Sequence, residues 1–135
     1  MLYEGYSKTI NIEAQTMLHM ASKHYIPSVI KYTTELASSL TAVQAACPAA
    51  DTSVQSELLC QVSGLLSQAS AARATLEAVT AETNAISDAP AMAHAFHDKV
   101  TPAMAALRES VDKLELLVNK DYWPVPTYGD LMFEV

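Results

Sequence analysis

Residues 54–86, VQSELLCQVSGLLSQASAARATLEAVTAETNAI, carry the most regular apolar pattern in the chain. The apolar positions recur every three or four residues, about 3.5 on average, which is the spacing of a long helix in an antiparallel bundle. They are Val54, Leu58, Val62, Leu65, Ala69, Ala72, Leu76, Val79, Thr83 and Ile86. Asp51 or Thr52 is the expected N-cap, and Thr52 to Gln55 has the spacing of a capping box.

Helical periodicity also extends on both sides of this segment. The apolar stripe before this segment predicts a helix over about residues 7–46, and the stripe after it predicts one over about 88–119. Residues 87–90 (SDAP) end one helix and start the next, with a capping residue followed by proline. Pro27 and Pro102 lie inside these stripes, and a proline removes a backbone donor and clashes with the carbonyl four residues earlier. We therefore expect a kink at each proline.

The expected fold is all-α. Three long helices, at about 7–46, 52–86 and 88–119, would form a single domain, because short connections make successive helices antiparallel neighbours. We expect an elongated antiparallel bundle whose first and third helices are kinked at proline. Residues 120–135 would form an irregular aromatic tail, since Pro124 and Pro126 forbid helix there.

Charge and composition exclude several classes of function. The net charge is −7, which disfavours nucleic acid and anionic membranes as partners. No apolar run is long enough to span a membrane, and the N-terminus does not resemble a secretory signal, so we expect a cytoplasmic protein with Cys47 and Cys60 reduced. Only 17% of residues are charged, which indicates that some outer faces of the helices are covered by another chain or domain.

The residues that could carry chemistry do not form a recognisable site. The glycines stand alone, so no phosphate-binding loop exists, and neither cysteine has the basic neighbours of a nucleophile. His94, His97 and Asp98 have a commonplace spacing, and His19 and His24, five residues apart, are not expected to share a helix face. Asp112 with Glu115, and Glu77 with Glu82, are expected to be solvated. We therefore predict no catalytic, cofactor-binding or metal-binding residue.

Both ends of the chain resemble a known family. Residues 123–133, WPVPTYGDLMF, are similar to the terminal W-P-x-P-x-Y-x-x-[LM]-[LM]-F motif of type III glutamine synthetases. Residues 8–14 (KTINIEA), 27–32 (PSVIKY), 102–104 (PAM) and 107–108 (LR) are similar to the C-terminal helices of the same family.

The resemblance implies that the chain is a C-terminal helical fragment of an ATP- and Mg²⁺-dependent ligase that joins ammonia to glutamate. Enzymes of this family form double-ringed dodecamers, and their active site is built upstream of the C-terminal helices. None of their nucleotide, metal or glutamate motifs occurs here, so no catalytic residue is carried over and no cofactor is expected in the fragment itself. The chain's abrupt start suits an excised fragment with an added Met1.

We therefore expect a structural and interaction domain that packs on the catalytic domain of its parent chain and on neighbouring subunits of a homo-oligomer. The expected docking anchors are Trp123, Tyr128, Leu131 and Phe133, since aromatic and large apolar side chains dominate such contacts. The alternative is a free-standing helical sensor or adaptor, for which flanking transmembrane segments would argue. An enzyme in its own right is the least favoured reading.

Overall fold

The computed structural model describes residues 2–124, and within that range the chain forms helices and no strand. The all-α prediction is therefore confirmed. The helices are α1 (Leu2–Met20), η1 (Ala21–Tyr25), α2 (Ile26–Ala46), α3 (Ser53–Asn84), α4 (Ala89–Ala95), η2 (Phe96–Val100) and α5 (Thr101–Leu117), where η marks a π-helical segment.

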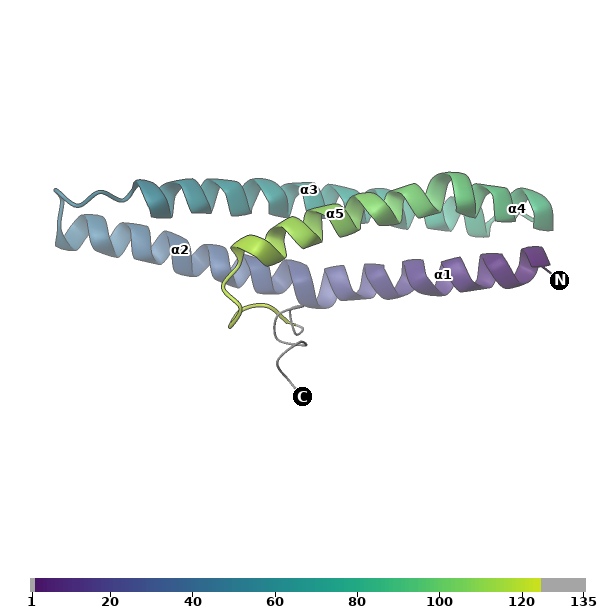
Figure 1. The fold of residues 1–135 in the computed structure, drawn as a ribbon, viewed down its shortest axis with the longest axis horizontal. Coiled ribbons are helices and arrows are strands. Elements are labelled where there is room, and N and C mark those ends of the chain that lie inside the picture. The colour runs from purple at the N-terminus through teal and green to yellow at the C-terminus, as the bar shows by residue number, and fades with distance from the viewer. Residues whose placement is uncertain (1, 125–135) are drawn as a thin grey trace.

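These segments join end to end into three long rods, as Figure 1 shows. The first rod is α1, η1 and α2, the second is α3, and the third is α4, η2 and α5. The second rod returns alongside the first from the loop at 47–52, and the N-terminus lies at the same end of the molecule as α4. The first rod begins at Leu2, five residues before the expected start at Ser7.

A π-helical segment ends two residues before each internal proline. The N–H of Ile26 donates to the carbonyl of Ala21, and the N–H of Thr101 donates to the carbonyl of Phe96, so both bonds reach five residues back. The Thr101 hydroxyl donates to the same Phe96 carbonyl at 3.1 Å. Both rods therefore continue through their proline, and a kink there stays a prediction.

The core has two parts, one toward each end of the bundle. The first gathers around Leu76, Phe96 and Leu107, each at most 1% exposed, with the small side chains Ala14 and Ala21 letting the first rod approach closely. The second gathers around Val29, Val62 and Leu114, with Trp123 at its edge. The middle rod contributes side chains to both parts of the core, so it lies against both the first rod and the third rod.

Two expectations about the middle rod are wrong. Val54 was expected on the buried stripe but is 72% exposed, because α5 ends part-way along the bundle and leaves the α2–α3 tip only two helices wide (Figure 1). The capping box of Thr52 is the second, because Thr52 occupies the N-cap position but makes no side-chain cap bond. The carboxylate of Asp51, the other expected capping residue, accepts from the Ser53 N–H at 3.0 Å. The capping residue expected within residues 87–90 is Asp88, whose carboxylate accepts from the Ala91 N–H at 3.0 Å.

Candidate docking surface

A tight turn after α5 brings the chain back to the first rod. The Tyr122 N–H donates to the Asn119 carbonyl at 2.9 Å, and the Trp123 N–H donates to the Lys120 carbonyl at 3.2 Å. The Asn119 side chain closes the turn by accepting from the Asp121 N–H at 2.9 Å. Two consecutive aromatic side chains are thereby held against one face of the first rod.

Tyr25, Tyr32, Tyr122 and Trp123 form what we call the aromatic clamp. The rings of Tyr25 and Trp123 are stacked, with centroids 5.2 Å apart and planes at 30°, and those of Tyr32 and Tyr122 are 5.6 Å apart and tilted at 51°. Tyr25 and Tyr32 are two helical turns apart and therefore lie on one face. Trp123 is only 7% exposed, so this anchor residue packs on the bundle itself.

Burial and neighbouring carboxylates govern the electrostatics of the clamp. Burial, followed by the charges of Glu115 and Asp112 on α5, raises the pKa of Tyr25. Burial raises the pKa of Tyr122 as well, with the charge of Glu35 and a hydrogen bond to it adding to the effect. The clamp hydroxyls are thus held in their neutral form.

One polar feature qualifies the Trp123 anchor. Its buried Nε1 atom finds no hydrogen-bond partner in the part of the chain that the structure describes, so the side chain is held by ring contacts and apolar packing. The other three expected anchors, Tyr128, Leu131 and Phe133, lie outside the described residues, and their docking role stays a prediction.

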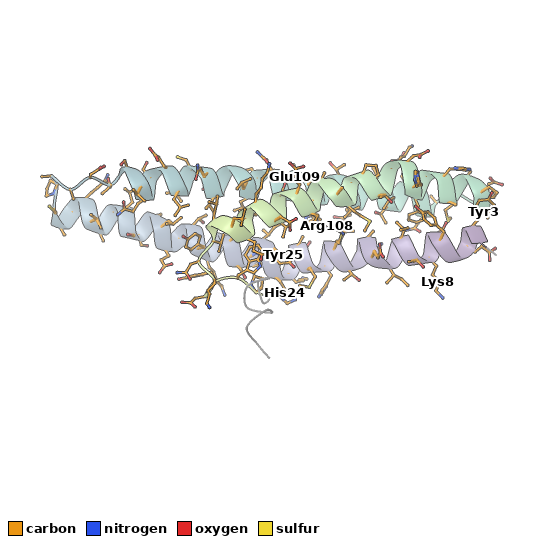
Figure 2. All side chains as sticks on the ribbon, in the orientation of Figure 1. Tyr3, Lys8, His24, Tyr25, Arg108 and Glu109 are labelled. Atoms are coloured by element: carbon orange, nitrogen blue, oxygen red, sulfur yellow. The ribbon has the colours of Figure 1, made fainter. Side chains whose placement is uncertain are left out.

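A hollow of about 240 Å³ lies beside the clamp, between the first rod and α5. Met17, Met20 and Tyr25 give it an apolar lining, while Arg108 and Asp112 add one charge of each sign. The Arg108 guanidinium lies 3.8 Å from the Met17 sulfur (Figure 2 labels Arg108 and Tyr25). With methionine side chains and one tyrosine ring in its lining, this hollow has the composition of a packing surface.

The remaining candidate groups are dispersed over the surface. His97 Nδ1 lies 2.9 Å from an Asp98 carboxylate oxygen, and both side chains are more than two-thirds exposed. Glu77 pairs with Arg73 at 2.6 Å along α3. Among residues 2–124, no group of three or more histidine, cysteine or acidic side chains converges as a metal site would require. Cys47 and Cys60 are both free and exposed.

The expectation for His19 and His24 is wrong. Their ring centroids are 5.7 Å apart in an edge-to-face arrangement. Residues five apart diverge on an α-helix, but the π-helical segment η1 widens the turn between them and brings both rings to one side. A proline within the stripe was the available sequence signal, because it indicated that the regular turn would be disturbed just there.

None of the helices in the described range is long and apolar enough to cross a membrane.

Comparison with known proteins gives a consistent set of relatives. The model of the glutamine synthetase C-terminal domain family matches residues 1–44. The glutamine synthetase of Bacteroides fragilis (strain YCH46) is 23% identical over 134 residues, which cover 96% of this chain and 18% of that protein. That of Butyrivibrio fibrisolvens is 24% identical over 135 residues, covering 100% and 19%. A type-3 glutamine synthetase of Dictyostelium discoideum is 26% identical over 137 residues, covering 98% and 19%. The chain thus spans about a fifth of the length of these proteins.

Truncating Trp123 should destabilise the chain strongly. We expect Trp123→Ala to lower the free energy of unfolding by about 3 kcal/mol, since removing a buried aromatic ring leaves a cavity. Trp123→Phe keeps a ring on Tyr25 and should cost about half as much or less. Leu116→Ala, at a side chain 86% exposed, is the matched control and should change stability by less than about 0.5 kcal/mol. Urea unfolding measures all three, and equal losses for Trp123→Ala and Leu116→Ala would contradict the anchor role.

The raised pKa of Tyr25 predicts a loss of stability in alkali. A tyrosine whose pKa is higher in the folded state contributes stability that is complete below the unfolded value, about 10, and is lost as pH rises through the folded value. Tyr25→Phe keeps the ring on Trp123 but cannot ionise, so its stability should fall less steeply above about pH 10 than that of the wild type. Urea unfolding at a series of alkaline pH values tests this. Parallel curves for the two proteins would show that Tyr25 is not the group responsible.

Proposed function

Because this chain is a relative of the C-terminal domain of glutamine synthetases, we propose that it is the structural and interaction domain of a larger enzyme of that kind. In this proposal the domain packs on the catalytic part of its own chain and on neighbouring subunits of a cytoplasmic homo-oligomer. ATP, Mg²⁺ and the conversion of glutamate to glutamine belong to the upstream catalytic part. The three rods are proposed to act as an elongated antiparallel bundle, kinked at Pro27 and Pro102.

The proposal rests on how much of this chain and of each relative the alignments cover. Three glutamine synthetases align with nearly all of this chain, yet the chain accounts for only about a fifth of each of them. The matching family model is that of a C-terminal domain. A domain of this size, with its candidate chemical groups dispersed over its surface, is suited to binding and bracing a larger enzyme.

Exposed apolar side chains support the proposal that other parts of the enzyme cover this domain. Six large apolar or aromatic side chains in residues 2–124 are at least 36% exposed, among them Ile30 at 50%, Val54 at 72% and Leu116 at 86%. Single exposed apolar residues are ordinary on a soluble surface, but here they accompany a low content of charge. In this proposal Tyr3, Tyr6 and Leu116 of this set are buried against a catalytic domain or a neighbouring subunit.

The aromatic clamp gives the proposed contacts a fixed starting point. Trp123 ties the end of the third rod to the first rod, through its ring contact with Tyr25 and its burial. We propose that Tyr128, Leu131 and Phe133 then supply anchors to the rest of the enzyme. Trp123 acts in this scheme as the internal anchor that orients them.

The test uses the full-length enzyme with Tyr128→Ala and Phe133→Ala combined, and Val54→Ala as the control at the two-helix tip. Losing two aromatic anchors should raise the protein concentration at which the oligomer dissociates at least about tenfold, whereas the control should leave it unchanged. Analytical ultracentrifugation measures the dissociation. Unchanged assembly and unchanged thermal stability in the double variant would rule out the anchoring role. ATP-dependent glutamine formation by residues 1–135 alone would contradict the proposal that catalysis belongs to the upstream part of the enzyme.

A further inference from the structure

The end of the bundle that holds the N-terminus carries an aromatic hollow. Tyr3 and Tyr6 of α1 line it together with His94 of α4 and His97 of η2, and Ala93 forms its floor. Its volume is about 420 Å³, enough to receive one or more large side chains. Figure 2 shows Tyr3 at this end, beside the start of the first rod.

The lining side chains are open to solvent. Tyr3 is 47% exposed and Tyr6 is 36% exposed, and both histidines are exposed as well. His97 engages Asp98 through Nδ1, at 2.9 Å, which leaves its Nε2 edge available. The hollow therefore combines ring faces with phenol and imidazole groups that can hydrogen-bond, a composition typical of protein-binding surfaces.

The size of this surface decides what kind of partner it fits. The exposed parts of the two phenol side chains amount to roughly 150–200 Å², and the histidines add a similar area at most. A stable complex between separate proteins needs about 800 Å² on each partner. A tethered partner needs far less, because a short linker gives an effective concentration in the millimolar range.

We propose that the aromatic hollow of Tyr3, Tyr6, His94 and His97 is the seat of the polypeptide that immediately precedes this domain in the larger enzyme, with an apolar side chain of that segment inserted between the rings. This inference rests on the proposed function. The relatives are about five times as long as this chain, and the matching family model is that of a C-terminal domain, so the greater part of such an enzyme precedes it. In the proposal that part joins the domain at the start of the first rod, which lies at the same end of the bundle as the hollow.

The occupant closes the hollow by burying ring surface, while the tyrosine hydroxyls and the free imidazole edges donate to or accept from its backbone. The contact fixes the direction in which the first rod leaves the catalytic part. It thereby sets where the other end of the bundle, some tens of ångströms away given the length of α3, points in the assembly.

Two measurements on the full polypeptide test the proposal. The first is hydroxyl-radical footprinting of the full polypeptide and of residues 1–135 alone. Tyr3 and Tyr6 should react about fivefold more slowly in the full polypeptide, as expected for side chains that become buried. Ile12 and Ile30, which are 55% and 50% exposed on the same rod, are the matched controls and should change by less than about twofold.

The second measurement identifies the occupant. A benzophenone-bearing phenylalanine in place of Tyr3 should cross-link within one chain to a peptide upstream of residue 1, and the same label at Ile30 should not. A cross-link between chains, or slower tyrosine oxidation in residues 1–135 as their concentration is raised, would assign the hollow to a second copy and overturn the proposal. So would tyrosines that stay equally reactive in the full polypeptide.

The two proposals fail in different ways. If Tyr3 and Tyr6 stay equally reactive in the full polypeptide but its assembly still depends on this domain, only the proposed occupant of the aromatic hollow is rejected. A gene in which no catalytic region precedes this domain would reject both.

Discussion

Pro27 and Pro102 each remove a backbone donor inside a long helix, and the packing of the first and third rods depends on how the chain continues past them. In both places the preceding N–H reaches five residues back, from Ile26 to Ala21 and from Thr101 to Phe96. The wider turn accommodates the proline without breaking the rod. Because both rods continue, residues on either side of each proline pack against the same middle rod.

The positions brought together around the first π-helical segment show what this continuity achieves. Ala21, at its start, is buried in one part of the core, and Tyr25, at its end, stacks on Trp123 beside the other part. The same segment places the rings of His19 and His24 5.7 Å apart. The aromatic clamp then fastens the end of the third rod to the first, so the position of Trp123 depends on the geometry at Pro27.

Much of the fold could be predicted from the sequence because the buried positions of a long helix recur every three or four residues. The stripes gave the three rods, and residues 87–90 marked the start of the third. The first π-helical segment is also visible in the sequence, because Met17, Ala21, Tyr25 and Val29 follow one another in steps of four, wider than the average of 3.6. Periodicity could not reveal that Val54 is exposed, since that depends on where another rod ends, nor that Tyr3 and Tyr6 meet His94 and His97, which lie about 90 residues away.

The continuity of the rods can be measured directly by NMR, through scalar couplings across backbone hydrogen bonds. We expect a coupling between the amide nitrogen of Ile26 and the carbonyl carbon of Ala21, and another between Thr101 and Phe96. Couplings of Ile26 to Ser22 and of Thr101 to His97 would indicate ordinary α-helical turns. Those couplings, or the absence of any coupling at these amides, would contradict the π-helical passage of the chain through its prolines.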